Sequence, residues 1–376
     1  MMSPKASAMP FEVNAVCKRL QLEAVNMGKA LPTLGAMEAL RLLKAGNAFL
    51  DVRSEGEFAA GAIPGSSNGP ILTNDERHLV GTTYKQIGSA EAVALGHKLV
   101  DPHRPARVAG WAAKLAGQAV PLVACWRGGM RSGLAQSWLA EAGVPAVKIS
   151  GGYKALRAIL LEEIARPRAG LVIAGNTGSG KTKLLRSLKS ASVVDLEDMA
   201  GHRGSSFGGL FLPEQPSQGT FENRLGLALF STEEGQRLLL EDESRLVGRC
   251  VIPDPFYKSL SALPRFELET PFFERVQNIY EEYVEGPLRS FPPELVHEKL
   301  DGSIEALRNR LGGADTNELR AMLKDSFQKK APHEAWIEFL LRRYYDPLYA
   351  YAMARHPHKI LARGSASELK SFLARG

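Results

Sequence analysis

The sequence predicts an α/β protein made of two parallel-sheet units, the second of which carries a helical region. Short apolar runs alternate with amphipathic stretches along most of the chain, as in βα units on a parallel sheet. A glycine-rich phosphate-binding pattern directly follows one of these runs. The length of 376 residues and the composition, 44% hydrophobic and 23% charged, fit two ordinary domains and exclude a disordered or fibrous chain.

The first unit is predicted to cover 36–166, after an N-terminal extension at 1–35 that shows only weak helical periodicity. Its strands are expected where apolar runs end at turn residues, at 49–53, 120–124 and 146–149. Its helices are expected from Met37 to the stop signal Gly46-Asn47, over 132–142 and over 153–165.

The second unit is predicted to cover 167–376, with the boundary at Arg166-Pro167-Arg168. Its strands are expected at 171–174, 193–195, 238–241 and 359–362. Between about 270 and 355 the pattern becomes helical. The apolar stripe of this region is predicted to contain Phe273, Val276, Ile279, Tyr280 and Val284.

Charge and cysteine content limit which partners and which cellular compartment are expected. Residues 1–168 hold 20 basic and 13 acidic side chains, whereas 169–376 hold 27 and 28. The excess suggests a polyanionic partner for the first unit, although ordinary variation in surface charge explains it equally well. Cys17, Cys125 and Cys250 lack the spacing of a zinc site or a disulfide framework. With no signal peptide and no apolar run near the roughly 20 residues that span a bilayer, we expect a soluble, cytoplasmic protein without a membrane partner.

A phosphate-binding loop is predicted where the strand at 171–174 ends. The pattern G-x-x-x-x-G-K-[ST] is formed by Gly175, Asn176, Thr177, Gly178, Ser179, Gly180, Lys181 and Thr182. Glycines let backbone amides turn inward around phosphate oxygens, and Lys181 adds a positive charge for terminal phosphates. Thr182 is a possible Mg²⁺ ligand, although no metal site is certain. A ligand-free glycine turn is the less favoured interpretation.

A supporting carboxylate is expected at the end of a neighbouring strand, where it would hold metal or water. Asp195 follows one predicted strand, and Glu241, Asp242 and Glu243 end the next. The sequence does not decide among these four, and solvated turn residues are an equally good interpretation of acidic strand ends.

The second candidate site is the loop Cys125-Trp126-Arg127-Gly128-Gly129-Met130-Arg131-Ser132, between a predicted strand and a helix. Loop amides, the following helix N-terminus and the guanidinium groups of Arg127 and Arg131 all favour a thiolate at Cys125. We therefore predict Cys125 to be a nucleophile with Arg127 and Arg131 in catalytic support, whereas Cys17 and Cys250 are predicted to be inert.

The first unit resembles the rhodanese fold, whose loop cysteine carries a persulfide. The resemblance rests on Asp51-Val52-Arg53, on Glu57-Phe58, on Gly61 to Gly65, on Cys125 and on Gly151-Gly152-Tyr153. The loop departs from many single-domain rhodaneses in having five rather than four residues between cysteine and arginine. Cys-x5-Arg is also the spacing of cysteine phosphatases, and the loop alone does not separate the two.

From about Phe49 to the C-terminus, the chain is similar to tRNA 2-selenouridine synthases, in which a rhodanese unit precedes a P-loop NTPase-like unit. The motifs are those at 74–86, 94–100, 195–197, 202–208, 221–223, 240–245 and 344–347. Some relatives have cysteines where Thr83 and Ala124 stand, which leaves Cys125 as the sole candidate selenium carrier. We recognise no counterpart of the extension at 1–35 in this family.

This resemblance implies a two-step exchange of sulfur for selenium at the wobble 2-thiouridine of tRNA. The thione sulfur first attacks geranyl diphosphate to give S-geranyl-2-thiouridine. Selenophosphate then supplies selenium, which Cys125 would hold as a perselenide anion. The co-substrates implied are geranyl diphosphate and selenophosphate, with Mg²⁺ possible. The partners implied are tRNA and an enzyme that supplies selenophosphate.

Basic and aromatic side chains are the candidates for tRNA contacts. They are Tyr84, Lys85, His202, Arg203, Arg245, Arg342 and Arg343. The tyrosines at 344, 345, 349 and 351 are further candidates, but their helical spacing fits a core stripe at least as well.

Four other functions remain open from the residues alone. A P-loop nucleotide kinase or NTPase would use the first unit only for binding, and a plain rhodanese-type sulfurtransferase would leave the phosphate loop without a role. A Cys-x5-Arg phosphatase lacks an evident general acid. A non-enzymatic RNA-binding scaffold would use neither loop.

Overall fold

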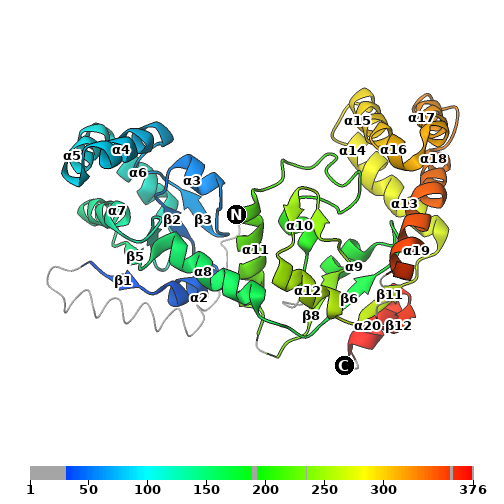
Figure 1. Ribbon diagram of the computed structural model, residues 1–376, viewed down its shortest axis with the longest axis horizontal. Coiled ribbons are helices and arrows are strands. Elements are labelled where there is room, and N and C mark those ends of the chain that lie inside the picture. The colour runs from blue at the N-terminus through cyan, green and yellow to red at the C-terminus, as the bar shows by residue number, and fades with distance from the viewer. Residues whose placement is uncertain (1–30, 189–192, 234, 356–358, 375–376) are drawn as a thin grey trace, which may run out of the picture. The chain divides into compact units, whose positions relative to one another are not determined.

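The computed structural model describes residues 31–188, 193–233, 235–355 and 359–374 (Figure 1). These residues form two structural units: the first comprises the described residues up to Glu163 together with Ser217–Ser231, and the second comprises those from Ile164 to Pro216 and from Thr232 onward. The predicted α/β class, with parallel sheets in both units and a helical region in the second, is confirmed. Most of the predicted N-terminal extension, Cys17 included, lies outside the described residues.

The first unit is built on a five-stranded parallel sheet with the strand order β1-β5-β4-β2-β3. Its strands are β1 (Thr33–Leu34), β2 (Phe49–Asp51), β3 (Ser66–Asn68), β4 (Leu122–Ala124) and β5 (Val147–Ile149). Three of them match the predicted strands. The two edge strands, β1 and β3, were not predicted, because β1 has only two residues and β3 is Ser-Ser-Asn.

Helices cover both faces of this sheet, so the unit has three layers. One face packs against α2 and α8, and the other packs against α6 and α7. The helices are α2 (Ala36–Lys44), α3 (Glu55–Ala59), α4 (Asn74–Gln86), α5 (Ser89–Val100), the 3₁₀ turn η1 (Asp101–His103), α6 (Arg104–Leu115), α7 (Met130–Glu141) and α8 (Gly152–Ala165).

One further helix of the first unit, α11 (Gln218–Ser231), comes from the middle of the second unit's sequence. Thr220 Oγ1 accepts from the Ala62 amide at 2.9 Å, and Asn223 Nδ2 donates to the Ala62 carbonyl at 3.1 Å. Phe221 is fully buried, and a Cβ atom at Gly226 would lie 2.7 Å from Leu160 Cβ. The motif Phe221-Glu222-Asn223 therefore serves to attach this helix to the first unit.

The second unit contains a five-stranded parallel sheet with the order β12-β11-β6-β8-β7 and a separate antiparallel pair, β9-β10. The strands are β6 (Gly170–Ala174), β7 (Val193–Val194), β8 (Leu238–Glu241), β9 (Leu246–Val247), β10 (Cys250–Val251), β11 (Arg265–Leu268) and β12 (Ile360–Gly364). Helices α9 (Lys181–Ser187), α10 (Leu196–Ala200), α12 (Asp254–Ala262) and α20 (Ala366–Ala374) accompany the sheet. The four predicted strands are present, and β9, β10 and β11 are additions.

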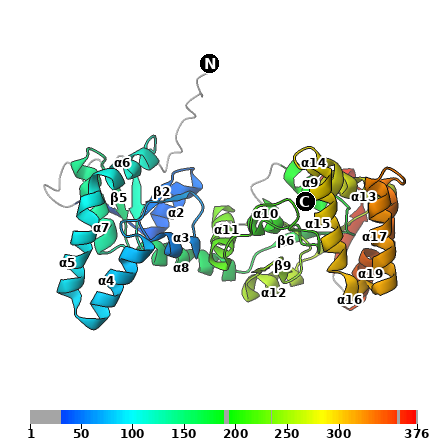
Figure 2. The same ribbon diagram turned by 90° about the horizontal axis from the view of Figure 1, so that it is seen from above.

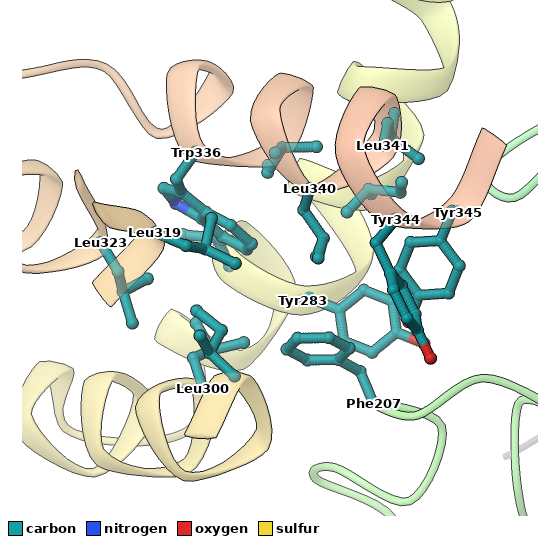
Figure 3. Packing of buried hydrophobic residues seen from close by; sticks show 14 of the residues in the cluster. Phe207, Tyr283, Leu300, Leu319, Leu323, Trp336, Leu340, Leu341, Tyr344 and Tyr345 are labelled. Atoms are coloured by element: carbon teal, nitrogen blue, oxygen red, sulfur yellow. The ribbon is translucent and has the colours of Figure 1, made fainter. Parts of the chain in front are cut away.

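The helical region has a core of its own, shown in Figure 3. Its elements are α13 (Phe272–Tyr280), the π-helical turn η2 (Glu281–Glu285), α14 (Gly286–Leu288), α15 (Pro293–Glu305), α16 (Arg308–Leu311), α17 (Gly313–Phe327), α18 (His333–Leu340), the π-helical turn η3 (Leu341–Tyr345) and α19 (Asp346–Arg355). The prediction for Phe273 is wrong, since 71% of its side chain is exposed. The stripe instead begins one residue earlier, at Phe272, and continues through Val276 and Ile279.

Candidate functional site

Cys125 lies immediately after β4, with 3% of the residue exposed. Its Sγ atom is 3.2 Å from Ser132 Oγ. The carbonyls of Cys125 and Trp126 accept from the Tyr153 and Lys154 amides at the start of α8. Within the described part of the chain, the amides of Trp126 to Gly129 have no hydrogen-bond acceptor. The loop thus leaves the amides of Trp126 to Gly129 available as donors, as an anion site requires.

Two glycines make this tight loop possible. Gly128 has φ +65° and Gly152 has φ +56°, in the left-handed region that glycine tolerates best. A Cβ atom at Gly128 would lie 2.6 Å from the Ile149 carbonyl oxygen, and one at Gly152 would lie 2.2 Å from that of Cys125. The Gly151-Gly152-Tyr153 motif is therefore a steric requirement of the cysteine loop.

The two arginines of the loop have different surroundings. Arg131 donates to Glu57 at 2.6 and 3.2 Å, and Arg77 Nε lies 3.2 Å from the same carboxylate. Burial opposes the charge of Arg131, but the hydrogen bond and charge of Glu57 outweigh it and raise the Arg131 pKa. Arg127 is exposed and has no ion pair among the described residues. Arg127 therefore has the more available charge for an anion at the loop.

The motif Asp51-Val52-Arg53 forms a buried ion pair rather than a reactive group. Arg53 Nε donates to Asp51 at 2.8 and 3.0 Å, and both side chains are fully buried. Arg53 also donates to the carbonyls of Glu57 and Gly61 at 3.0 and 2.9 Å, and its guanidinium lies 3.7 Å from the centre of the Tyr153 ring. Arg53 thereby links β2 to the segments that flank the cysteine loop.

Glu57 makes the stability of this network depend on pH. Burial alone would raise the pKa of Glu57, but the hydrogen bond and charge of Arg131, the Ser54 amide and Arg77 lower it below the usual 4.5. A lowered pKa adds stability at pH values above the unfolded-state pKa, and that stability is lost as the pH falls through the folded-state pKa. We expect Glu57→Gln to lower the free energy of unfolding at neutral pH by about 1 kcal/mol.

The same variant should lose less stability in acid than the wild type does. Urea unfolding followed by tryptophan fluorescence at neutral and acid pH measures both effects. Asp75→Asn, at an exposed position on α4, is the matched control. An equal acid sensitivity of Glu57→Gln and the wild type would contradict the expectation.

The phosphate-binding loop follows β6 and is braced from outside by the α13 segment. Thr270 Oγ1 donates to the Ser179 carbonyl at 3.0 Å, Arg275 Nε to that of Thr177 at 2.9 Å, and Asn278 Nδ2 to that of Gly178 at 2.9 Å. Gly175, Gly178 and Gly180 have φ values of +155°, +80° and +79°. With its carbonyls occupied, the loop leaves the amides of Asn176 to Gly178 and of Gly180 without an acceptor in the described residues.

Lys181 and Thr182 complete the loop. Lys181 Nζ donates to the Gly175 carbonyl at 2.7 Å. Thr182 Oγ1 lies 3.0 Å from Glu197 Oε2 and 3.0 Å from Glu241 Oε2. A threonine hydroxyl has one proton, so it donates to only one of these carboxylates at a time.

Three carboxylates gather beside Thr182. Ligand atoms of Glu197, Glu241 and Glu243 lie within 4.8 Å of one another. Burial, followed by mutual repulsion, raises the pKa of Glu241 to about 8, and burial also raises that of Glu197 to about 7. Glu241 Oε1 is buried and has no hydrogen-bond partner within the described parts of the chain. Oxygen ligands that repel one another and include an unpartnered atom suit a divalent cation such as Mg²⁺.

The other two predicted carboxylates are directed elsewhere. Asp195 caps α10 by accepting from the Asp198 amide at 2.8 Å, and it pairs with Arg186 at 2.7 Å. Asp242 pairs with Arg265 at 2.9 Å. Glu197, which the sequence analysis did not choose as a site residue, lies in the cluster instead. The i, i+2 spacing of Glu241 and Glu243, with the similar pair Asp195 and Glu197, was the available signal.

The loop at 201–208 closes over these carboxylates. Gly204 has φ +66°, and a Cβ atom there would lie 2.7 Å from Glu243 Oε2 and 3.0 Å from Glu197 Oε1. Beside it, Arg203 Nε pairs with Glu282 at 2.5 Å, and its guanidinium lies 5.4 Å from the centre of the Tyr283 ring. The backbone of this loop is therefore part of the carboxylate site.

The candidate tRNA residues are divided between the two units. Tyr84 and Lys85 are exposed on α4 in the first unit, whereas the other five lie in the second. There, His202 borders Arg203, Arg245 pairs with Asp254, and Arg342 lies 4.0 Å from the centre of the Phe272 ring. Arg343 is 3.5 Å from Asp315. Tyr344 and Tyr345 belong to the helical core, as Figure 3 shows, while Tyr351 is 59% exposed.

Arg275 is a further functional residue that sequence reasoning missed. Besides the loop carbonyl of Thr177, it binds Asp346, at 2.5 and 3.3 Å, and it is 5% exposed. The motif Tyr344-Tyr345-Asp346-Pro347 thus supports the phosphate-binding loop indirectly, because Asp346 positions the arginine that donates to the loop.

Fold and sites together define a two-unit protein with a rhodanese-like unit that carries a loop cysteine and a P-loop unit that carries three grouped carboxylates. The family model "Rhodanese-like domain" matches 36–158, and the model "tRNA 2-selenouridine synthase AAA domain" matches 168–376. The chain belongs to the tRNA 2-selenouridine synthase family. No helix within the described residues is long and apolar enough to cross a membrane.

Similar proteins support this assignment over most of the chain. A tRNA 2-selenouridine synthase from Shewanella loihica is 40% identical over 358 residues, covering 90% of this chain and 95% of the relative. Those from Marinobacter nauticus and a Sulfurovum species are each 39% identical, over 84% and 86% of this chain and over 90% and 93% of their own lengths.

Proposed function

We propose that this protein converts wobble 2-thiouridine in tRNA to 2-selenouridine through an S-geranyl intermediate, with geranyl diphosphate and selenophosphate as co-substrates. The supporting observation is the presence of two amide-lined anion sites in one chain of this family, with Cys125 at one and Lys181 at the other. An enzyme that makes selenophosphate would supply the second donor. The two sites suit the two steps of the exchange.

The first step is assigned to the phosphate-binding loop. The thione sulfur attacks C1 of geranyl diphosphate, an S–C bond forms, and the C–O bond breaks with its electron pair leaving on diphosphate. The N3 proton of the uridine goes to solvent. Negative charge grows on the departing diphosphate, and the loop amides and Lys181 stabilise such charge in place. This step needs no nucleotide hydrolysis.

Thr182, Glu197, Glu241 and Glu243 would hold Mg²⁺ next to the diphosphate. When bound, the cation would neutralise phosphate oxygens and relieve the repulsion among the three carboxylates. The raised pKa values of Glu197 and Glu241 and the unpartnered Glu241 oxygen support this assignment.

The second step is assigned to the cysteine loop. Water cleaves the P–Se bond of selenophosphate, so that inorganic phosphate leaves and selenium, at the oxidation level of selenide, bonds to C2 of the S-geranyl nucleoside. The C2–S bond then breaks, and the geranyl thiol leaves with a proton. Alkylation in the first step makes this sulfur a better leaving group. The cysteine loop holds the selenium donor without an S–Se bond: the sulfur atom of Cys125 lies beside it, and the amides of Trp126 to Gly129 together with Arg127 stabilise its negative charge.

Gly204→Ala tests the carboxylate site. Its Cβ atom would displace Glu243 and Glu197, so we expect geranyl transfer to fall by about 10- to 100-fold, while selenation of tRNA geranylated beforehand stays unchanged. Gly235→Ala is the matched control, because Gly235 has φ +81° with nothing within 4 Å of an added Cβ. Single-turnover assays measure both steps. Equal losses in the two variants would assign the effect to backbone strain alone.

The function as a whole is tested by mass spectrometry of nucleosides from 2-thiouridine tRNA incubated with the protein. Geranyl diphosphate alone should yield S-geranyl-2-thiouridine, and added selenophosphate should yield 2-selenouridine, in both cases without ATP. Unchanged 2-thiouridine in both samples would refute the proposal. A first step that requires ATP turnover would instead support a nucleotide-dependent P-loop enzyme.

A further inference from the structure

The first unit contains an apolar cavity of about 430 Å³ that has no role in geranyl transfer or selenation as described above. Its volume falls in the range of small-ligand pockets, roughly 300–1,000 Å³. Figure 2 shows α4 and α5 side by side, and each helix turns one face to the cavity. The cavity is lined by residues of α4, of α5 and of α7.

The space exists because small residues occupy the facing positions of the two helices. Gly81 and Ser89 stand where larger apolar side chains would close a helical hairpin, and a Cβ atom at Gly81 would meet nothing within 4 Å. Helix α4 has no buried residue, although Val80 and Tyr84 face the cavity. An apolar helix face left uncovered in this way marks a binding surface rather than a core.

The charge of the lining selects an anionic ligand. Arg77, Lys85, His97 and Arg131 line the cavity, and no carboxylate does among the described residues. Arg77 and Arg131 both pair with the carboxylate of Glu57. Two positive charges thus face one negative charge, and one positive charge is not neutralised. An apolar interior with cationic side chains fits a hydrocarbon chain joined to an anionic group.

The cavity also borders the selenium site. Met130 and Arg131 line it and are the first two residues of α7, directly after the cysteine loop. Ser132, the next residue of α7, has its Oγ atom 3.2 Å from Cys125 Sγ. A chain that enters this cavity would therefore have its polar end near the sulfur atom of Cys125.

We propose that this cavity binds the geranyl chain of S-geranyl-2-thiouridine in tRNA during the second step, an inference that rests on the proposed function. The chain lies between α4, α5 and α7, and the basic side chains meet the phosphates of the nucleotide. The cavity thereby holds C2 of the alkylated nucleoside beside the Cys125 loop and retains the geranyl group until it leaves as the thiol. Free geranyl diphosphate also carries a geranyl chain, and the experiment below distinguishes its binding from binding of the geranylated nucleoside.

The test is Gly81→Leu, which fills the cavity from a helix face without a close contact. With 2-thiouridine tRNA, geranyl diphosphate and selenophosphate, we expect S-geranyl-2-thiouridine to accumulate and 2-selenouridine formation to slow by about 10- to 100-fold. Gly110→Leu is the matched control, since Gly110 is an exposed glycine within α6 that does not line the cavity and has equal free space. It should behave as the wild type.

Chain length separates cavity filling from damage to the cysteine loop. Gly81→Leu should still convert S-dimethylallyl-2-thiouridine tRNA, whose chain is half as long, at close to the wild-type rate. Loss of selenation with both chains, unchanged selenation with both, or a block at 2-thiouridine would each overturn the proposal. The last result would assign the cavity to geranyl diphosphate.

Binding supplies a readout that does not depend on turnover. An S-geranyl anticodon stem-loop should bind the full-length wild type at least about tenfold more tightly than the unalkylated stem-loop, and Gly81→Leu should lose this preference. If the wild type shows the preference but forms no 2-selenouridine, the proposed function fails and the cavity assignment stands. If it turns over without any preference, only the cavity assignment fails.

Discussion

Cys125→Ala is expected to abolish selenation and to leave geranyl transfer largely intact. The substitution removes the sulfur atom that lies 3.2 Å from Ser132 Oγ, while the phosphate-binding loop lies in the other unit and keeps all its contacts. Removing a catalytic group that acts in one step reduces that step on the order of 10³-fold or more. Nucleoside mass spectrometry should show S-geranyl-2-thiouridine as the end product, even with selenophosphate in excess.

Cys250→Ala is the control for this variant. Cys250 is 1% exposed, similar to Cys125, but it lies in β10 of the second unit and its Sγ atom is 3.8 Å from the Pro216 carbonyl oxygen. It should retain both steps. If Cys125→Ala folds like the wild type and loses both steps, or retains selenation, the cysteine loop does not hold the selenium.

Lys181→Ala should have the opposite effect. The ammonium group lies within the phosphate-binding loop, next to the carbonyl of Gly175, and its charge offsets the three carboxylates. Loss of one preorganised cation at a departing diphosphate is expected to slow geranyl transfer by about 10²- to 10³-fold. Selenation of tRNA that already carries S-geranyl-2-thiouridine should proceed at the wild-type rate.

Lys183→Ala supplies the matched control two residues further along α9. The Lys183 side chain is 77% exposed and lies 3.5 Å from Glu281. Both steps should be unaffected by its removal. The comparison is made in single turnovers, with geranyl diphosphate for the first step and with geranylated tRNA for the second. A Lys181→Ala variant that geranylates normally would remove the first step from the phosphate-binding loop.

Local patterns explain why the fold class and both loops could be predicted. An apolar run followed by glycines and a helix has a short-range signature, so β4 with the cysteine loop and β6 with the phosphate-binding loop were recognised directly. Glu197 was missed because its place in the carboxylate cluster depends on where β7 ends relative to β8. Arg275 was missed because it contacts the phosphate-binding loop from 98 residues away in sequence, and no local pattern indicates such a contact.

The cavity and the tyrosines illustrate a second limit. Helices α4 and α5 lack a clear apolar stripe, because the residues that face each other are small and leave a space. Tyr344 and Tyr345 have the composition of a nucleic-acid contact, yet packing places them in the helical core. Composition does not distinguish an aromatic side chain that binds a base from one that fills a core.

The position of α11 has a consequence for the synthesis of the chain. The first unit needs Phe221, Leu225 and Leu229 to complete its core, and these residues are translated only after β6, α9 and β7 of the second unit. The nascent first unit must therefore wait, with an apolar surface still uncovered, while part of its neighbour emerges from the ribosome. Because α11 follows β6, α9 and β7 in the sequence, the first unit cannot finish folding before part of the second unit has been synthesised.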